Sequence, residues 1–316
     1  MKTKIIKAPE FICIYNLAYI YTTYDLLYKI NSEVFDNDVI VHLDLSDVKL
    51  ITAAASVLLF ATVNTCQLAN KNPNQIRCIF PKDKVNEAGH NCIVKTGLAR
   101  ALHSGSILKL KDLVTSEVYF QSEINAGRHI SHTVDFLTSK VDLSAEQFEM
   151  LSSAITEAML NVSHHAYKDP TFIGPIAECP IHPKKEFLVD RQGERWWQCA
   201  WYNEQDKIWV FIICDLGLGI PETYLANKPN NKEPFSTILK EAFTIGNSRY
   251  IGQGRGNGSE NIKSPVGLSC KKTESLLVYS GGIRYEYNSE MEEPKVNDLN
   301  KFFSGTLVEW TLSVGG

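Results

Sequence analysis

Apolar residues recur with a helical period between Ser144 and Tyr167. They occupy positions 148, 151, 155, 159 and 162, a spacing that places them along one stripe of a helix. Ser144 is followed three residues later by Gln147, and this pair can cap the first turn of a helix. The pattern predicts a helix that starts at Ser144 and packs its apolar stripe against a core.

Glu157 and Asn161 lie on a polar face of this predicted helix. They are four residues apart, about 40° from each other and roughly opposite the apolar stripe. A carboxylate and a carboxamide one turn apart can place a general base and a metal-ligating oxygen beside the same bound group. Solvated helix faces carry the same residue types, so the pair alone does not distinguish a site from a surface.

The first hundred residues alternate between strand and helix patterns. The predicted elements are a strand at 39–45, a helix at 53–69, a strand at 75–80 and a helical segment that leads to Gly97 and Leu98. This order is typical of a small α/β domain. The composition becomes mixed between residues 104 and 120, so we expect a first domain at 1–112 and a second at 121–316.

The composition is that of an ordinary soluble globular protein. Of the 316 residues, 44% are hydrophobic and 22% are charged, and the net charge of −4 gives no electrostatic reason to expect a nucleic acid or an anionic membrane as partner. The chain opens with no secretory signal pattern, and polar residues interrupt its uncharged run at 50–70. We therefore expect a cytoplasmic protein that binds neither membranes nor nucleic acids.

The eight cysteines include no CxxC pair, which favours reduced thiols over disulfides. Cys179 and His182 form a lone CxxH, and Cys199 or His164 could complete a zinc site with them. Four scattered ligands are weak evidence for zinc, and a proline-rich surface loop explains the same residues.

Two later stretches have the character of a ligand site. A predicted hairpin ends at Asp215, which Gly217 and Gly219 follow; the glycines let the backbone approach a flat ligand while the carboxylate accepts from an exocyclic amine. Further on, the glycine-rich stretch GQGRGNG offers free amides that could cradle phosphates, with Arg255 as a charge partner. Taken singly, the first stretch could be a tight turn and the second a flexible linker.

In this order, these pieces resemble the GHKL ATP-binding fold of gyrase B subunits, sensor histidine kinases, MutL proteins and anti-sigma-factor kinases. The resemblance covers residues 121–316 and implies a two-layer α/β sandwich in which a mixed sheet carries its helices on one face. It implies that Asn161 ligates Mg²⁺, that Glu157 positions or deprotonates the nucleophile and that Asp215 reads the adenine amino group of ATP. Further residues implied to bind the nucleotide are Gly217, Gly219, Ser248, Arg249, Gly254, Arg255, Gly256, Asn257, Gly258 and Thr306.

One departure from that family concerns Pro265, which interrupts the helix that follows the glycine loop in the family. Ser264-Pro265 is itself a signal for the start of a helix, so the helix could restart there and run to Thr273.

Residues 35–103 are similar to the STAS domain of anti-sigma-factor antagonists. The segments that carry the similarity are LDLSDVKLITAAASVLLF and TGLARAL. The phosphoacceptor serine of that family would fall at Ala54, with Thr52 and Ser56 as the nearest hydroxyls. A phosphorylation switch at this turn is therefore not expected, and a docking domain without chemistry of its own is the better interpretation.

Two functions follow from these resemblances. The first is an Mg-ATP enzyme that hydrolyses ATP slowly or phosphorylates a Ser or Thr of a protein partner. The second is a nonenzymatic switch, in which ATP orders the segment between Pro221 and Gly258 and so gates a partner. Glu157 favours the first function, because a pure binding module needs no base. The sequence does not identify the protein partner, and it does not decide whether the chain forms a homodimer.

Overall fold

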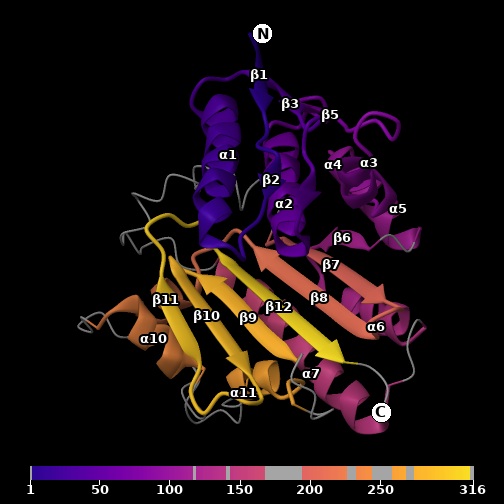
Figure 1. Ribbon diagram of the computed structural model, residues 1–316. Coiled ribbons are helices and arrows are strands. Elements are labelled where there is room, and N and C mark those ends of the chain that lie inside the picture. The colour runs from indigo at the N-terminus through magenta and orange to yellow at the C-terminus, as the bar shows by residue number, and fades with distance from the viewer. Residues whose placement is uncertain are drawn as a thin grey trace. The chain divides into compact units, whose positions relative to one another are not determined.

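The computed structural model describes residues 2–116, 119–139, 143–167, 194–225, 233–243, 258–267 and 274–313. The chain separates into two compact units, Met1–Ser122 with Cys179–Cys199 and Glu123–Glu178 with Ala200–Gly316. Both units combine helices with strands, so the chain is α/β as expected (Figure 1). Within the described ranges, no helix combines the length and the apolar character needed to cross a membrane.

A three-stranded parallel sheet forms the base of the first unit. Its order is β1 (Thr3–Lys7), β3 (Ile40–Asp44) and β5 (Ile76–Ile79). A second, two-stranded parallel sheet pairs β2 (Phe11–Ile12) with β4 (Leu50–Ile51). The strands predicted at 39–45 and 75–80 are confirmed as β3 and β5, whereas β1, β2 and β4 were not predicted.

Helices α1 (Leu17–Phe35) and α2 (Ala53–Ala69) pack against each other (Figure 1). The start and end predicted for α2 are confirmed, and every residue from 54 to 69 is buried. The buried side chain of Asn64 has two partners: it donates to the carbonyl oxygen of Ser104 at 2.9 Å and accepts from the Trp197 indole at 2.9 Å. These bonds offset the cost of removing an amide from water inside a helix that has no solvated face.

Short helical segments complete the first unit. They are α3 (Glu87–His90), the π-helical turn η1 (Asn91–Lys95), α4 (Leu98–Leu102) and α5 (Ile107–Thr115). Gly97 lies between η1 and α4 with φ of 86°, a left-handed conformation that favours glycine. The helical segment expected before Leu98 is therefore divided into several pieces.

A seven-stranded sheet forms the base of the second unit. Its order is β11 (Lys295–Asp298), β10 (Ile283–Asn288), β9 (Ser275–Ser280), β12 (Thr306–Ser313), β8 (Ile208–Asp215), β7 (Trp196–Asn203) and β6 (Phe120–Glu123). The division between the units passes through β6 and β7. The predicted hairpin is confirmed as β7 and β8. Strand β12 lies in the middle and pairs antiparallel with both β8 and β9.

Among the described residues, the helices of the second unit are α6 (Ala126–Thr138), α7 (Ala145–Asn161) with the π-helical turn η2 (Val162–Ala166), α9 (Ile220–Leu225), α10 (Phe235–Ala242) and α11 (Gly258–Lys263). Helix α7 packs on α6 and α11, and α10 packs on β10 and β11 (Figure 1). The capping box at Ser144 is confirmed. One expectation was wrong: Phe148, which was expected in the packed apolar stripe, is 41% exposed.

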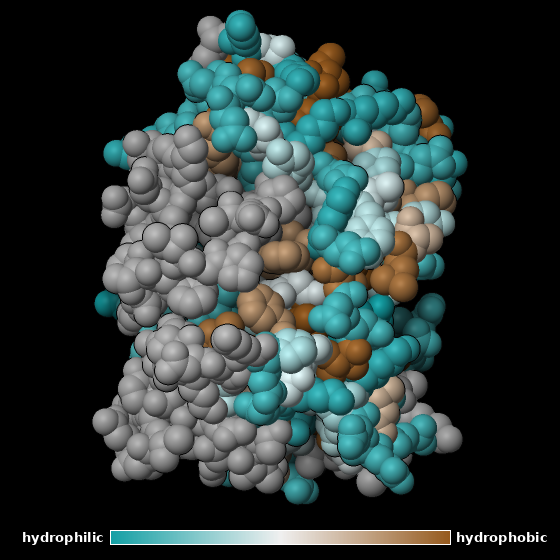
Figure 2. Space-filling view, turned by 90° about the vertical axis from the view of Figure 1, so that its left-hand side faces the viewer, coloured by the Kyte–Doolittle hydropathy of each residue, from teal (hydrophilic) through white to brown (hydrophobic). Residues whose placement is uncertain are grey.

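Large apolar side chains are exposed at a few positions of the described surface. They include Ile5, Leu17, Val85 and Leu108 of the first unit and Phe148 and Trp201 of the second. Figure 2 shows one face, on which hydrophilic residues predominate among the coloured atoms and hydrophobic ones are interspersed. Interspersed apolar residues of this kind are ordinary on folded domains.

Candidate functional site

The C-terminal end of α7 carries the first candidate residues. Leu151, Ile155 and Met159 are buried, which fixes the rotation of the helix, and Glu157 and Asn161 are partly exposed as the predicted polar face requires. Asn161 is the last residue of α7, and the chain continues directly into η2. π-Helical turns are rare and occur often at functional sites.

The turn formed by residues 215–219 lies directly against η2. The amide of Leu218 donates to the carbonyl oxygen of Ala166 at 2.7 Å, and the amide of Leu216 donates to the Tyr167 hydroxyl at 3.2 Å. A Cβ atom at Gly217 would lie 2.0 Å from the same Ala166 oxygen, so a side chain cannot be placed there without displacing backbone. The structure thus brings Ala166 and Tyr167, which follow α7, against a turn that lies about fifty residues further along the sequence.

Asp215 is 6% exposed at the end of β8. Burial raises the pKa of its carboxyl group to about 7, whereas hydrogen bonds from the amides of Gly217, at 2.8 Å, and Thr306 act to lower it. The start of β12 also lies against this residue, because a Cβ atom at Gly305 would be 2.1 Å from the Asp215 carbonyl oxygen. The expected neighbours Asp215, Gly217 and Thr306 are therefore close together.

Three hydroxyl groups connect the elements around this turn. The Ser304 hydroxyl donates to the Gly217 carbonyl oxygen at 2.5 Å. The Ser280 hydroxyl accepts from the amide of Ile220 at 2.8 Å and shares a hydrogen bond with the Thr306 hydroxyl at 2.9 Å. Ser280 and Ser304 were not among the predicted site residues, although each stands beside a glycine.

A second buried acid, Glu222, also escaped the sequence analysis. It follows Gly219 by three residues in α9 and is 1% exposed. Its position after Ile220-Pro221 resembles the first turn of any short helix, where an acidic residue is common. Only the structure distinguishes it from a solvated helix residue.

The glycine-rich stretch is described at its end alone. Gly258 begins α11, which packs on α7, and the Trp310 indole donates to the carbonyl oxygen of Ile262 at 2.7 Å. The predicted restart of the helix is wrong for residues 264–267, which form a turn in which the Ser264 hydroxyl donates back to the Asn261 carbonyl oxygen. The predicted residues Ser248, Arg249, Gly254, Arg255, Gly256 and Asn257 lie outside the described residues.

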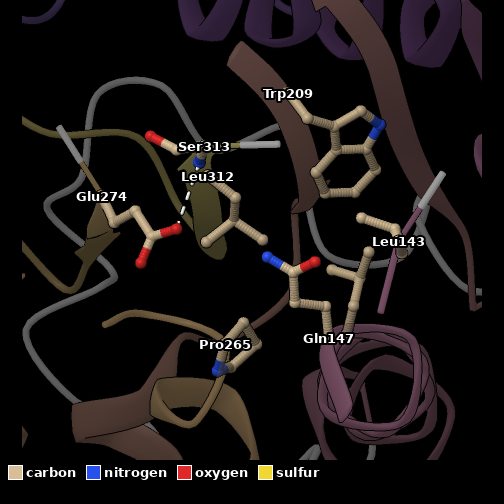
Figure 3. A pocket seen from close by; sticks show the side chains of 8 residues that line it. Leu143, Gln147, Trp209, Pro265, Glu274, Leu312 and Ser313 are labelled. Carbon is tan, nitrogen blue, oxygen red and sulfur yellow. Dashed lines mark hydrogen bonds between the residues drawn. The ribbon is translucent and has the colours of Figure 1, made fainter. Parts of the chain in front are cut away.

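A small pocket lies at the far end of the same central strands. Leu143, Gln147, Trp209, Pro265 and Leu312 help to line it, and its volume of about 10 Å³ has room for about one water molecule (Figure 3). The buried carboxylate of Glu274 accepts there from the amide of Ser313 at 3.2 Å (Figure 3). It also accepts from the amide of Gly267 at 2.7 Å. Trp209 is roughly 20 Å along β8 from Asp215, so this pocket is separate from the 215–219 turn.

The position at which a phosphoacceptor would fall in the first unit is buried. Ala54 is fully buried, and its amide donates to the Tyr15 hydroxyl at 3.3 Å. The Ser56 hydroxyl is also buried and donates to the Thr52 carbonyl oxygen at 2.9 Å. A side chain at position 54 therefore faces the interior of the unit.

Metal ligands are sparse in the described ranges. They contain no group of three or more His, Cys, Asp or Glu side chains that could hold a metal ion. The potential zinc ligands Cys179 and His182 lie outside the described residues. Asn161 could contribute a single carboxamide oxygen, which suits a cation whose other ligands are water and phosphate.

Comparison with known proteins gives no family assignment. None of the protein-family models matches the sequence, and no curated protein matches it either.

Proposed function

We propose that residues 121–316 are a GHKL-type domain that binds Mg-ATP and either hydrolyses it slowly or transfers its phosphate to a Ser or Thr of a protein partner. One observation carries the proposal. Three segments far apart in the sequence, 166–167, 215–219 and 304–306, meet at a single buried turn. The close backbone contacts at Gly217 and Gly305 and the buried Asp215 carboxyl group support a ligand site at this turn.

The chemistry of the buried turn suits an adenine ring. The Asp215 carboxyl group already holds two backbone amides and has a pKa of about 7, so near neutral pH it can present an oxygen to the exocyclic amine of adenine. The amide of Thr306 donates to this carboxyl group, and the Thr306 hydroxyl shares a hydrogen bond with the Ser280 hydroxyl. Bound adenine would thus exchange its hydrogen bonds to water for hydrogen bonds to fixed protein groups.

The polar face of α7 would serve the phosphates. The Asn161 carboxamide would hold Mg²⁺ through one oxygen, and Mg²⁺ would neutralise charge on the phosphates. Glu157 would orient the nucleophile that attacks the terminal phosphate and accept its proton. Water would be that nucleophile in hydrolysis, and the hydroxyl group of a Ser or Thr would replace it in phosphotransfer.

Calorimetric titration of the full-length chain with ATP and excess magnesium tests the nucleotide site. Asp215→Asn should weaken binding roughly 5- to 150-fold, the equivalent of about 1–3 kcal/mol for a misplaced buried hydrogen-bond partner. The control is Asp298→Asn, which makes the same change on an exposed residue of β11 and should leave binding unchanged. Equal binding by wild type and Asp215→Asn would contradict the assignment of the site.

Turnover, measured as ADP formed, separates the two functions. Glu157→Gln should keep ATP affinity and lose roughly 10²-fold or more in rate, because a general base is removed. Asn161→Ala should make binding independent of magnesium. If wild type binds ATP but neither forms ADP nor phosphorylates a protein, the nonenzymatic switch would be the better interpretation. Equal turnover by wild type and Glu157→Gln would contradict the role of Glu157 as the base.

A further inference from the structure

Glu222 occupies a closed gap beside the 215–219 turn. Its side chain is 1% exposed, and its Oε2 atom has no hydrogen-bond partner among the described residues. An unpartnered carboxylate removed from water is costly, by several kcal/mol for a real protein site. The group therefore belongs in this gap in its neutral form.

Two glycines create the gap that the carboxyl group fills. A Cβ atom at Gly219 would lie 2.9 Å from Oε2, and one at Gly281 would lie 3.2 Å from it. Both glycines have positive φ, 92° and 57°, so each sits in a turn that favours glycine. Gly219 ends the proposed adenine turn and Gly281 is the tip of the β9–β10 hairpin, so the carboxyl group of Glu222 lies where these two turns approach each other.

We propose that Glu222 is a positioning residue for the proposed nucleotide site, and that its protonated carboxyl group keeps the 215–219 turn closed on the β9–β10 hairpin. The inference rests on the proposed function. The hydrogen bond from the Ile220 amide to Ser280, at 2.8 Å, spans the same two turns. A carboxylate formed in the gap would have to draw in water or leave, and either change separates Gly219 from Gly281. Asp215, four residues before Gly219, would move with them.

The surroundings of Glu222 support a neutral group. Burial raises its pKa to about 8, and a hydrogen bond from its own amide acts weakly in the other direction. The titratable or charged groups on the described neighbouring elements include Cys214 and Asp215 of β8, His164 and His165 of η2, Lys240 and Glu241 of α10 and Arg284, Tyr285, Glu286 and Tyr287 of β10. Arg284 pairs with Glu286 at 3.1 Å, and Lys240 pairs with Glu293 at 3.6 Å. The raised pKa of Glu222 thus has desolvation as its cause.

The test is the pH dependence of ATP binding, with magnesium in excess. If only the protein with protonated Glu222 binds ATP, the wild-type Kd for ATP should rise roughly 25-fold between pH 7.5 and 9.5. Glu222→Gln keeps the shape of the neutral acid and cannot ionise, so its affinity at pH 7.5 should match wild type and should change less than about threefold up to pH 9.5. Glu222→Ala should bind weakly at every pH, because the gap is left unfilled.

Three results distinguish this inference from the proposed function. The control Glu292→Gln, on an exposed residue, should keep the wild-type pH profile. Wild type that binds ATP with a flat profile, or Glu222→Gln that keeps the alkaline loss of affinity, would overturn the role of Glu222 alone. Absence of ATP binding by wild type at any pH would overturn both proposals.

Discussion

Replacing Gly217 with alanine should damage the second unit through one steric contact. The added Cβ atom would lie 2.0 Å from the Ala166 carbonyl oxygen, whereas ordinary contacts begin at 3.4 Å. The 215–219 turn and the end of η2 would therefore have to separate by roughly 1.4 Å. Overpacking of this kind costs about 1–3 kcal/mol, and loss of the bond from Leu218 to Ala166 adds about 1 kcal/mol. We expect Gly217→Ala to lower the free energy of unfolding by about 2–4 kcal/mol.

Gly127→Ala provides the matched control for this substitution. Gly127 is exposed in the first turn of α6, where the nearest atom to an added Cβ is Asn125 Oδ1 at 3.7 Å. Alanine should stabilise the helix there by about 0.5–1 kcal/mol, because it reduces the freedom of the unfolded chain. Urea unfolding of the full-length chain measures both changes. Gly217→Ala within 0.5 kcal/mol of wild type would refute the packing of the turn against η2.

Two further predictions concern charge and capping. The pKa of Glu222 is raised from 4.5 to about 8 in the folded chain, so wild type loses stability as the pH rises between these two values. Glu222→Gln does not ionise. Between pH 5 and 7 its free energy of unfolding, relative to that of wild type, should therefore increase by about 2–3 kcal/mol. Unfolding in urea at both pH values tests this, and an unchanged difference would show that the carboxyl group is hydrated. Ser144→Ala breaks the capping box of α7 and should lower the free energy of unfolding by about 1 kcal/mol. The control Ser152→Ala, within the same helix, should leave it unchanged. Equal urea midpoints for the two variants would contradict the cap.

The predictions from sequence were most accurate where one local rule decides the structure. The limits of α2, the cap of α7 and the β7–β8 hairpin depend on periodicity, a capping pair and a polar turn, all of which are visible within a few residues. Strand β1 and helix α1 were missed although signals were present. Ile20, Tyr24, Leu27 and Val34 recur at helical spacing and are buried, and Asn16 caps the helix that contains them.

The sequence could not reveal features that depend on distant neighbours. Phe148 continues the apolar stripe of α7 by periodicity and is nevertheless exposed, because the core does not extend to that turn of the helix. Glu222, Ser280 and Ser304 acquire their roles only when β9, β12 and the 215–219 turn are brought together. The clash that restricts Gly217 to glycine likewise comes from Ala166, which the chain reaches through a different element.

The central place of β12 has a consequence for synthesis of the chain. Strand β8 ends at Asp215, but its partner β12 begins at Thr306 and must also insert beside β9. Until residues 306–313 have left the ribosome, β8 and β9 each carry an unpaired edge in the middle of the future sheet. Such edges can pair with other chains, and pairings so distant in sequence form slowly. The edges of β8 and β9 are therefore exposed during synthesis. A chaperone that covers strand edges in this period would raise the yield of folded protein.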